Sequence, residues 1–152
     1  MQSPAFCLWM MSAAIALASP PKGPETVTVR GKVLLLADAL KARGLELSPD
    51  AEPIAKQVVV LGQDQTITPL LSDETSRALF LDERLRNRKA QIVGRRFAGV
   101  PYLQVVTIQV ESEGRLRTPE YFCEVCTISV RYPQICPCCQ GPMVLRMRPA
   151  TR

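Results

Sequence analysis

Apolar residues recur at every second position in the first clear element of this chain. Between residues 27 and 35, valine and leucine alternate with mostly polar residues, and only Gly31 interrupts the apolar row. A period of two is that of a half-buried β-strand, and a glycine inside it predicts a bend or bulge. A continuous apolar run at residues 57–61 predicts a second strand. A turn at residues 62–65 then returns the chain as a third strand at residues 66–68.

Two short helices are predicted around these strands. Residues 37–43 end in basic side chains before Gly44, which suits the left-handed backbone of a helix C-cap. Ser72 is placed to cap a second helix. The apolar stripe of that helix would be formed by Ala78, Leu79, Leu81 and Leu85. Two further strands, at residues 90–96 and 102–111, complete the set.

The order strand, strand, strand, helix, strand, strand over residues 25–114 resembles the OB-fold, a five-stranded barrel. The Arg-Gly-Lys-Val segment at residues 30–33 looks like the bent first strand of that fold. The Ala-Gln-Ile-Val-Gly-Arg segment at residues 90–95 looks like the strand after its helix. The chain is similar here to small exported bacterial OB-fold proteins. The resemblance implies a mainly β barrel outside the cytoplasm and brings no catalytic residues with it.

Two Cys-x2-Cys pairs lie near the end of the chain. Cys123 pairs with Cys126 and, after nine residues, Cys136 with Cys139. Each such turn points two thiolates at one centre, and two turns complete a tetrahedron around a metal ion. Each Cys-x2-Cys turn, here called a knuckle, is followed by a short strand, and this order over residues 115–148 resembles a zinc ribbon. The Cys-Pro-x-Cys turn resembles rubredoxin-like sites. A structural zinc ion is the favoured cofactor, because so short a segment cannot bury a core of its own.

The cysteine motif also has competing interpretations. Cys138 is a fifth thiol inside the second knuckle and an alternative ligand to Cys139, and Gln140 stands where a turn-making glycine is usual. Disulfides are expected of an exported protein, although the five cysteines that remain once Cys7 leaves with the signal peptide cannot all pair within the chain. A redox-active pair of Cys136 and Cys139 is the third interpretation, although neither Cys-x2-Cys pair has the strand-to-helix context of thioredoxin.

The start of the chain predicts export. Residues 6–18 are apolar apart from Ser12, which is the length of a signal-peptide core and short for a membrane span. An Ala-x-Ala motif places the cleavage before Ser19. We therefore expect a signal peptide at residues 1–18, with an uncleaved membrane anchor as the alternative, and a proline-rich linker at residues 19–24. The protein would lie in the periplasm or cell envelope and would touch a membrane only through the apolar segment.

Composition narrows the chemistry further. The chain has no histidine, which excludes Ser-His-Asp and Cys-His catalysis and histidine-bound metals. Its formal net charge of +5 modestly favours acidic partners. OB-folds bind single-stranded nucleic acid with basic charge and aromatic platforms together, and the densest basic cluster here has few aromatic residues beside it. That cluster comprises Arg86, Arg88, Lys89, Arg95 and Arg96.

These patterns together predict a non-catalytic, exported binding or structural module that carries a four-thiolate metal site. The alternatives are a thiol–disulfide redox protein that uses Cys136 and Cys139, and a basic OB-fold that binds single-stranded nucleic acid. The sequence names no ligand; another protein or an envelope component fits these patterns better than nucleic acid does.

Overall fold

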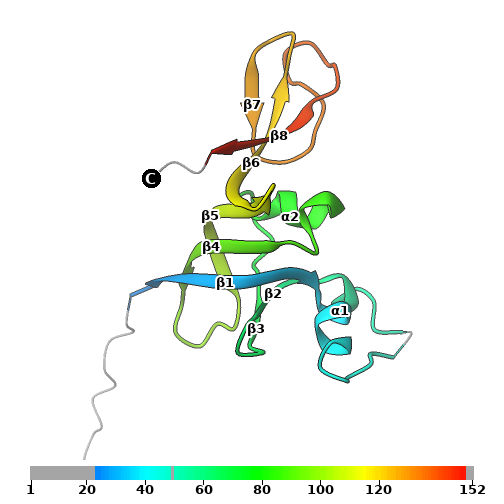
Figure 1. Ribbon diagram of the computed structural model, residues 1–152, viewed down its shortest axis with the longest axis vertical. Coiled ribbons are helices and arrows are strands. Elements are labelled where there is room, and N and C mark those ends of the chain that lie inside the picture. Colours follow the sequence, from blue (N-terminus) through cyan, green and yellow to red (C-terminus); the bar gives the residue numbers. More distant parts are fainter. Residues whose placement is uncertain (1–22, 49, 150–152) are drawn as a thin grey trace, which may run out of the picture.

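Strands make up most of the computed structural model, which describes residues 23–48 and 50–149 (Figure 1). The mainly β fold with short helices is confirmed, while the predicted signal peptide and most of the predicted linker lie outside the described residues. The strands are β1 (Glu25–Leu35), β2 (Val58–Gly62), β3 (Ile67–Pro69), β4 (Lys89–Arg96), β5 (Leu103–Ser112), β6 (Arg115–Cys123), β7 (Ile128–Val130) and β8 (Val144–Pro149). The helices are α1 (Leu36–Lys41) and α2 (Arg77–Leu81), with short 3-10 turns η1 (Ile54–Lys56) and η2 (Glu83–Leu85).

The second helix begins later than predicted. Ser72 does not cap it, because α2 starts at Arg77 after a turn closed by Asp73 and Ser76. The Ser76 N–H donates to Asp73 Oδ1 and the Asp73 N–H donates to Ser76 Oγ, both at 3.0 Å. These reciprocal bonds hold the predicted first helical turn in a non-helical conformation. Helix α2 is therefore only five residues long, and Leu81 of the predicted stripe is 54% exposed.

All strand ladders among the described residues are antiparallel and belong to one sheet. Its order is β3-β2-β1-β4-β5-β6-β7, and β8 pairs with the other edge of β6. The predicted order of strands and helix is present. Closure into a barrel is not shown, because in the described part of the chain β5 meets the end of β3 only at an isolated parallel bridge between Leu70 and Leu103. The sheet is therefore open.

Gly31 sits where β1 is paired on both sides, to Gly62 of β2 and to Ala90 of β4. A Cβ atom at this position would overlap the carbonyl oxygen of Leu61. The glycine at this position thus has a steric cause, since two strands approach more closely here than a side chain permits. The β1–β4 ladder keeps its register through Gly31, so the predicted bulge is not present there.

The main core lies between the sheet and α2. It is built mostly of valine, leucine and isoleucine from β1, β2, β4 and β5, with Leu70 just after β3, and Tyr121 of β6 is its largest fully buried side chain. Leu145 and Met147 of β8 pack against the same core. A small second cluster, Leu34, Ala39 and Val59, lies under α1. The C-terminal segment is therefore joined to the main core and not only tethered to it.

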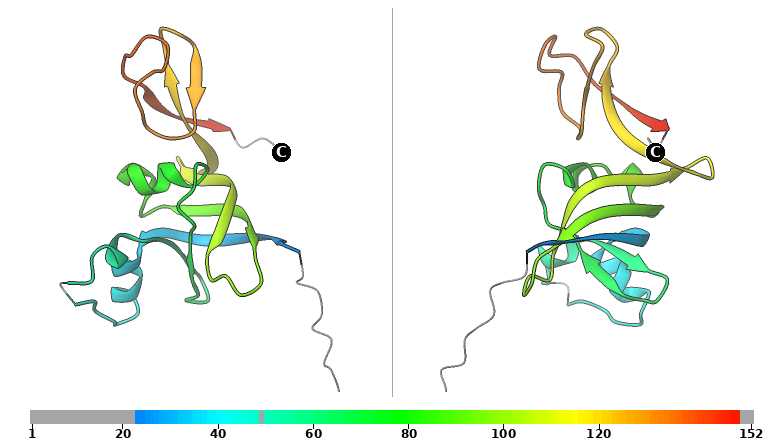
Figure 2. Two further views of the ribbon diagram at one scale, coloured as in Figure 1. Left: turned by 180° about the vertical axis from the view of Figure 1, so that it is seen from behind. Right: turned by 90° about the vertical axis from the view of Figure 1, so that its left-hand side faces the viewer.

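Strand β6 makes that join. It returns from β5 through a tight turn at Glu113 and Gly114, both with left-handed backbone (φ 52° and 72°), and pairs with β5 only as far as Val110 and Arg117. It then leaves the β5 edge and continues to the end of the molecule that carries β7 and β8 (Figures 1 and 2). The predicted boundary between residues 114 and 115 falls inside a β-hairpin of a continuous sheet.

A buried polar contact fixes β6 against the core. The Tyr121 hydroxyl donates to Asp82 Oδ2 at 2.6 Å, and Arg84 donates to the same carboxylate through Nε and Nη2 at 2.9 and 2.6 Å. Hydrogen bonds from Arg84 hold the pKa of Asp82 at about 2. Burial, followed by the contact with Asp82, raises the pKa of Tyr121 well above its ordinary value. The carboxylate is thus ionised and fully partnered, as a buried charge requires.

The steric role of Gly31 predicts that Gly31→Ala lowers the free energy of unfolding by about 2 kcal/mol or more, because β1 and β2 must separate to admit the methyl group. Gly23→Ala is the matched control, since a Cβ there meets nothing within 4 Å. Urea unfolding followed by circular dichroism measures both. Equal midpoints for the two variants would contradict the close approach of the strands.

The Asp82 contact predicts a loss of stability in acid. The pKa of Asp82 is lower in the folded chain than in the unfolded chain, so its contribution is present above about pH 4 and disappears as the pH falls towards 2. We expect this contribution to be about 2 kcal/mol, and Asp82→Asn to remove it. Glu83→Gln is the neighbouring control. Parallel pH–stability curves for the wild type and Asp82→Asn would show that the contact contributes nothing.

Candidate metal centre

Two tight turns bring the two Cys-x2-Cys pairs to one place at the tip of the molecule. The first begins where β6 ends, at Cys123, and leads into β7. The second, at residues 136–141, leads into β8. Because β7 and β8 flank β6 on opposite sides, the two turns are held next to each other by strand pairing (Figure 2).

The four predicted ligands converge. One sulfur atom from each of Cys123, Cys126, Cys136 and Cys139 lies within 4.8 Å of all the others, and the Cys123 and Cys139 sulfurs are 3.5 Å apart. Four thiolates bound at about 2.3 Å to one tetrahedral ion would be about 3.8 Å from one another. A disulfide would need about 2.05 Å. The observed arrangement therefore suits a shared ion.

The backbone of each turn explains its spacing. The Thr127 N–H donates to the Cys123 carbonyl at 2.9 Å, and the Gln140 N–H donates to the Cys136 carbonyl at 3.0 Å. Thr127 and Gln140 both have left-handed backbone, with φ of 55° and 59°. The two knuckles are thus equivalent. Gln140, which departs from the usual glycine, adopts the conformation that a glycine would supply.

Gly141 has a different role. The Cys136 N–H donates to its carbonyl at 2.9 Å, and a Cβ on Gly141 would lie 3.3 Å from the Cys139 sulfur. The glycine one place beyond the expected position therefore leaves room for the sulfur that completes the set.

The surroundings of two of the sulfurs shift their pKa values in opposite directions. Hydrogen bonds from the backbone N–H groups of Cys139 and Cys138 lower the pKa of Cys136 to about 7. Contacts with the thiols of Cys138 and Cys139, followed by burial, raise the pKa of Cys126 far above its ordinary value. Thiols held this close cannot all ionise on their own. A divalent cation would resolve the conflict, because thiolates are the form that binds metal.

Cys138 stands outside the group of four. It is exposed, and the set of mutually close sulfurs contains Cys139 in its place. Its thiol lies beside that of Cys126, so it borders the centre. The x2 spacing that favoured Cys139 as the fourth ligand agrees with this arrangement.

Arg146 of β8 supports the first knuckle from outside. Its guanidinium carbon lies 3.5 Å from the centre of the Phe122 ring, and its Nη2 donates to Glu124 Oε1 at 3.3 Å. The ion pair is exposed and contributes little by itself. Together with the cation–π contact it ties the residues on either side of Cys123 to β8.

The structure separates the basic residues predicted for nucleic-acid binding. Arg86 and Arg88 precede β4 and donate to backbone carbonyls of Phe80 and Glu111. Of the other three, Lys89 begins β4 and Arg95 and Arg96 end it, about 20 Å apart at 3.3 Å per residue. The five residues do not form one patch, and this weakens the nucleic-acid alternative.

The surroundings of the cysteines also bear on the redox alternative. Cys136 and Cys139 both belong to the four-sulfur group, and the chain after them enters strand β8. Neither turn opens a helix whose N-terminus would stabilise a reactive thiolate, as in thioredoxin. The geometry favours a centre closed by four ligands over an exchanging pair.

Comparison with protein-family models, curated proteins and solved structures finds no match for this chain. Across residues 23–48 and 50–149, no helix has the length and apolar character needed to cross a membrane. Sequence reasoning missed two residues of this region: Tyr121 of β6, and Arg131, which directly follows β7 and lines a cleft beside β5. The only signal for Tyr121 was an aromatic residue in an alternating strand two places before Cys123, and Arg131 gave none.

The left-handed backbone at Gln140 predicts that Gln140→Gly stabilises the second knuckle by about 1 kcal/mol, because glycine adopts this conformation without steric cost. Gln134→Gly, in the same loop but without a positive φ, should be neutral or destabilising. Chelator competition against each metal-loaded variant measures the difference. Weaker retention of metal by Gln140→Gly than by Gln134→Gly would contradict the proposed strain.

Proposed function

We propose that this protein is a non-catalytic, exported binding or structural module whose C-terminal end is held by a structural zinc ion. The observation that carries the proposal is the convergence of four sulfurs within 4.8 Å. An all-thiolate set suits soft or borderline ions such as zinc. Four protein ligands leave no open position for water or substrate, so the ion would stabilise structure and not catalyse a reaction.

We infer that the β1–β5 region is related to the OB-fold. The supporting observation is the strand order β3-β2-β1-β4-β5, with the parallel contact of Leu70 and Leu103 at the point where a five-stranded barrel would close. Helix α2 lies between β3 and β4, as in that fold. Export is inferred from the apolar N-terminal segment and the Ala-x-Ala motif of the sequence.

Metal analysis and cysteine variants test the zinc proposal. Protein purified under reducing conditions and given zinc should hold one ion per chain. Cys123→Ser and Cys136→Ser should each lose it, because a hydroxyl is a poor replacement for a thiolate. Hydrogen exchange should then quicken at residues 123–144 and remain slow in β1, β2, β4 and β5, whose ladders do not involve the knuckles.

Cys138→Ser is the matched control, since it removes a neighbouring thiol outside the group of four. It should keep the ion, whereas Cys139→Ser should release it; the opposite result would transfer the fourth ligand to Cys138. Metal-free protein with bonded sulfurs that catalyses disulfide exchange would replace the zinc proposal with the redox alternative.

A further inference from the structure

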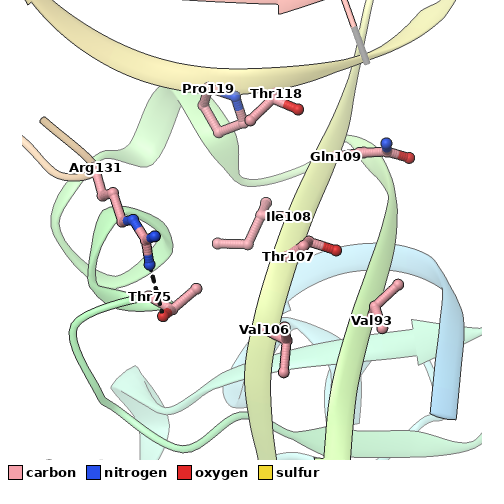
Figure 3. A pocket seen from close by; sticks show the side chains of 9 residues that line it. All are labelled: Thr75, Val93, Val106, Thr107, Ile108, Gln109, Thr118, Pro119 and Arg131. Atoms are coloured by element: carbon pink, nitrogen blue, oxygen red, sulfur yellow. Dashed lines mark hydrogen bonds between the residues drawn. The ribbon is translucent and has the colours of Figure 1, made fainter. Parts of the chain in front are cut away.

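A cleft with a volume of about 430 Å³ lies where the metal-bearing end meets the sheet (Figure 3). Strand β5 forms one wall, and the start of β6 lies above it. The loop before α2 and the residue after β7 form the opposite wall. Its lining is uncharged except for one arginine, and comprises Thr75, Val93, Val106, Thr107, Ile108, Gln109, Thr118, Pro119 and Arg131.

The wall formed by β5 is an unpaired strand edge. On the side away from β4, β5 is bonded to β6 only from Val110 onwards and to the end of β3 only at Leu103. Between these points, the described residues give residues 104–109 no strand partner on that side. A stretch of six residues spans about 20 Å. Its free N–H and C=O groups are those with which another strand can pair.

A β-bulge shapes this edge. Gly94 pairs with Val105 and Val93 pairs with Thr107, so Val106 is an extra residue in β5. Val106 and Thr107 are therefore both exposed, whereas their neighbours Val105 and Ile108 are buried. Bulges also protect edges from unwanted pairing. Here, however, the bulge places an apolar and a hydroxyl side chain together in the cleft.

Arg131 supplies the charge of the opposite wall. It is exposed, and its Nη1 donates to Thr75 Oγ1 at a long 3.4 Å, as Figure 3 shows. None of the ion pairs among the described residues includes it. A guanidinium has five N–H donors in a fork that matches a carboxylate. Most of these donors are free to bind an anionic group.

The metal centre positions Arg131. This residue directly follows β7, which pairs with β6 up to Cys123, the first sulfur ligand. The next residue, Tyr132, stacks with Arg77 of α2, whose guanidinium carbon is 4.8 Å from its ring centre. If the ion were lost, β7 would be held less firmly against β6, and Arg131 would lose its fixed position in the wall of the cleft.

We propose that this cleft binds an extended peptide segment of a partner protein, which adds to the free edge of β5 and presents a carboxylate side chain to Arg131. The backbone of β5 would supply main-chain hydrogen bonds. The apolar lining residues Val93, Val106 and Ile108 and the guanidinium of Arg131 would select the side chains of the peptide. The proposal rests on the proposed zinc site for the position of Arg131. It also names the kind of partner that the binding module would take.

The zinc-loaded protein can be titrated with the blocked peptide acetyl-TVEVT-amide and followed by amide NMR. The expected shifts lie at residues 104–109 and at Arg131. The glutamine peptide acetyl-TVQVT-amide should bind about tenfold more weakly, because a charge-assisted hydrogen bond is lost. The Arg131→Gln variant should bind the glutamate peptide with a similar loss. Arg43→Gln, which removes an exposed arginine after α1 that does not line the cleft, should leave binding unchanged.

A backbone N-methylated glutamate peptide separates strand addition from simple anion binding, because it keeps the carboxylate and loses main-chain donors. It should not bind. The proposal of strand addition would be overturned if this peptide bound as tightly as the unmethylated glutamate peptide. It would also be overturned if sodium acetate alone gave the same NMR shifts. An absence of shifts at residues 104–109 with every peptide would overturn it as well. Zinc content measured on each sample keeps a failure of the metal site distinct: a metal-free sample that binds the peptide normally would refute only the role of the ion.

Discussion

The C-terminal end of this protein depends on four sulfur atoms meeting at one point. Of the described residues after Cys123, Cys136 alone is buried. The other apolar side chains of this segment, such as Leu145 and Met147, are only partly buried against the main core, and this burial is too small to offset the conformational entropy of ordering more than twenty residues. An ion held by four thiolates would offset it, because its binding free energy becomes folding free energy. Two equivalent turns, each with one residue in left-handed backbone (Thr127 and Gln140), bring the four sulfur atoms to that point.

The same segment is anchored to the rest of the molecule by different means. Strand β6 belongs to the sheet at its start and to the knuckles at its end, and Tyr121 between them inserts its ring into the main core. The hydrogen bond from its hydroxyl to Asp82, which also pairs with Arg84, fixes the orientation of the ring in the core. The four-cysteine group and the core packing are therefore linked through a single strand, although each has its own stabilising interactions.

The departure of β6 from β5 creates the cleft beside β5. Had the two strands stayed paired along their length, the edge at residues 104–109 would be covered. Instead β6 turns towards the end that carries the four cysteines, which places Arg131 opposite the exposed edge (Figure 3). The proposed peptide site would thus be held between two structured parts of the molecule, as a recognition surface requires.

Local patterns in the sequence predicted the strands other than β6, their approximate bounds and the four cysteines that converge. This was possible because alternation, turn residues and Cys-x2-Cys spacing act within a few neighbours. The start of α2 was mispredicted, because the Asp73–Ser76 turn competes locally with a helix and no periodicity reveals which wins. Only the tertiary structure decided that the sheet stays open, that Asp82 faces Tyr121, and that Thr75 and Arg131 share a wall with β5. These contacts join residues 39 and 56 positions apart, and they depend on where β6 leaves the sheet, which no short stretch of sequence encodes.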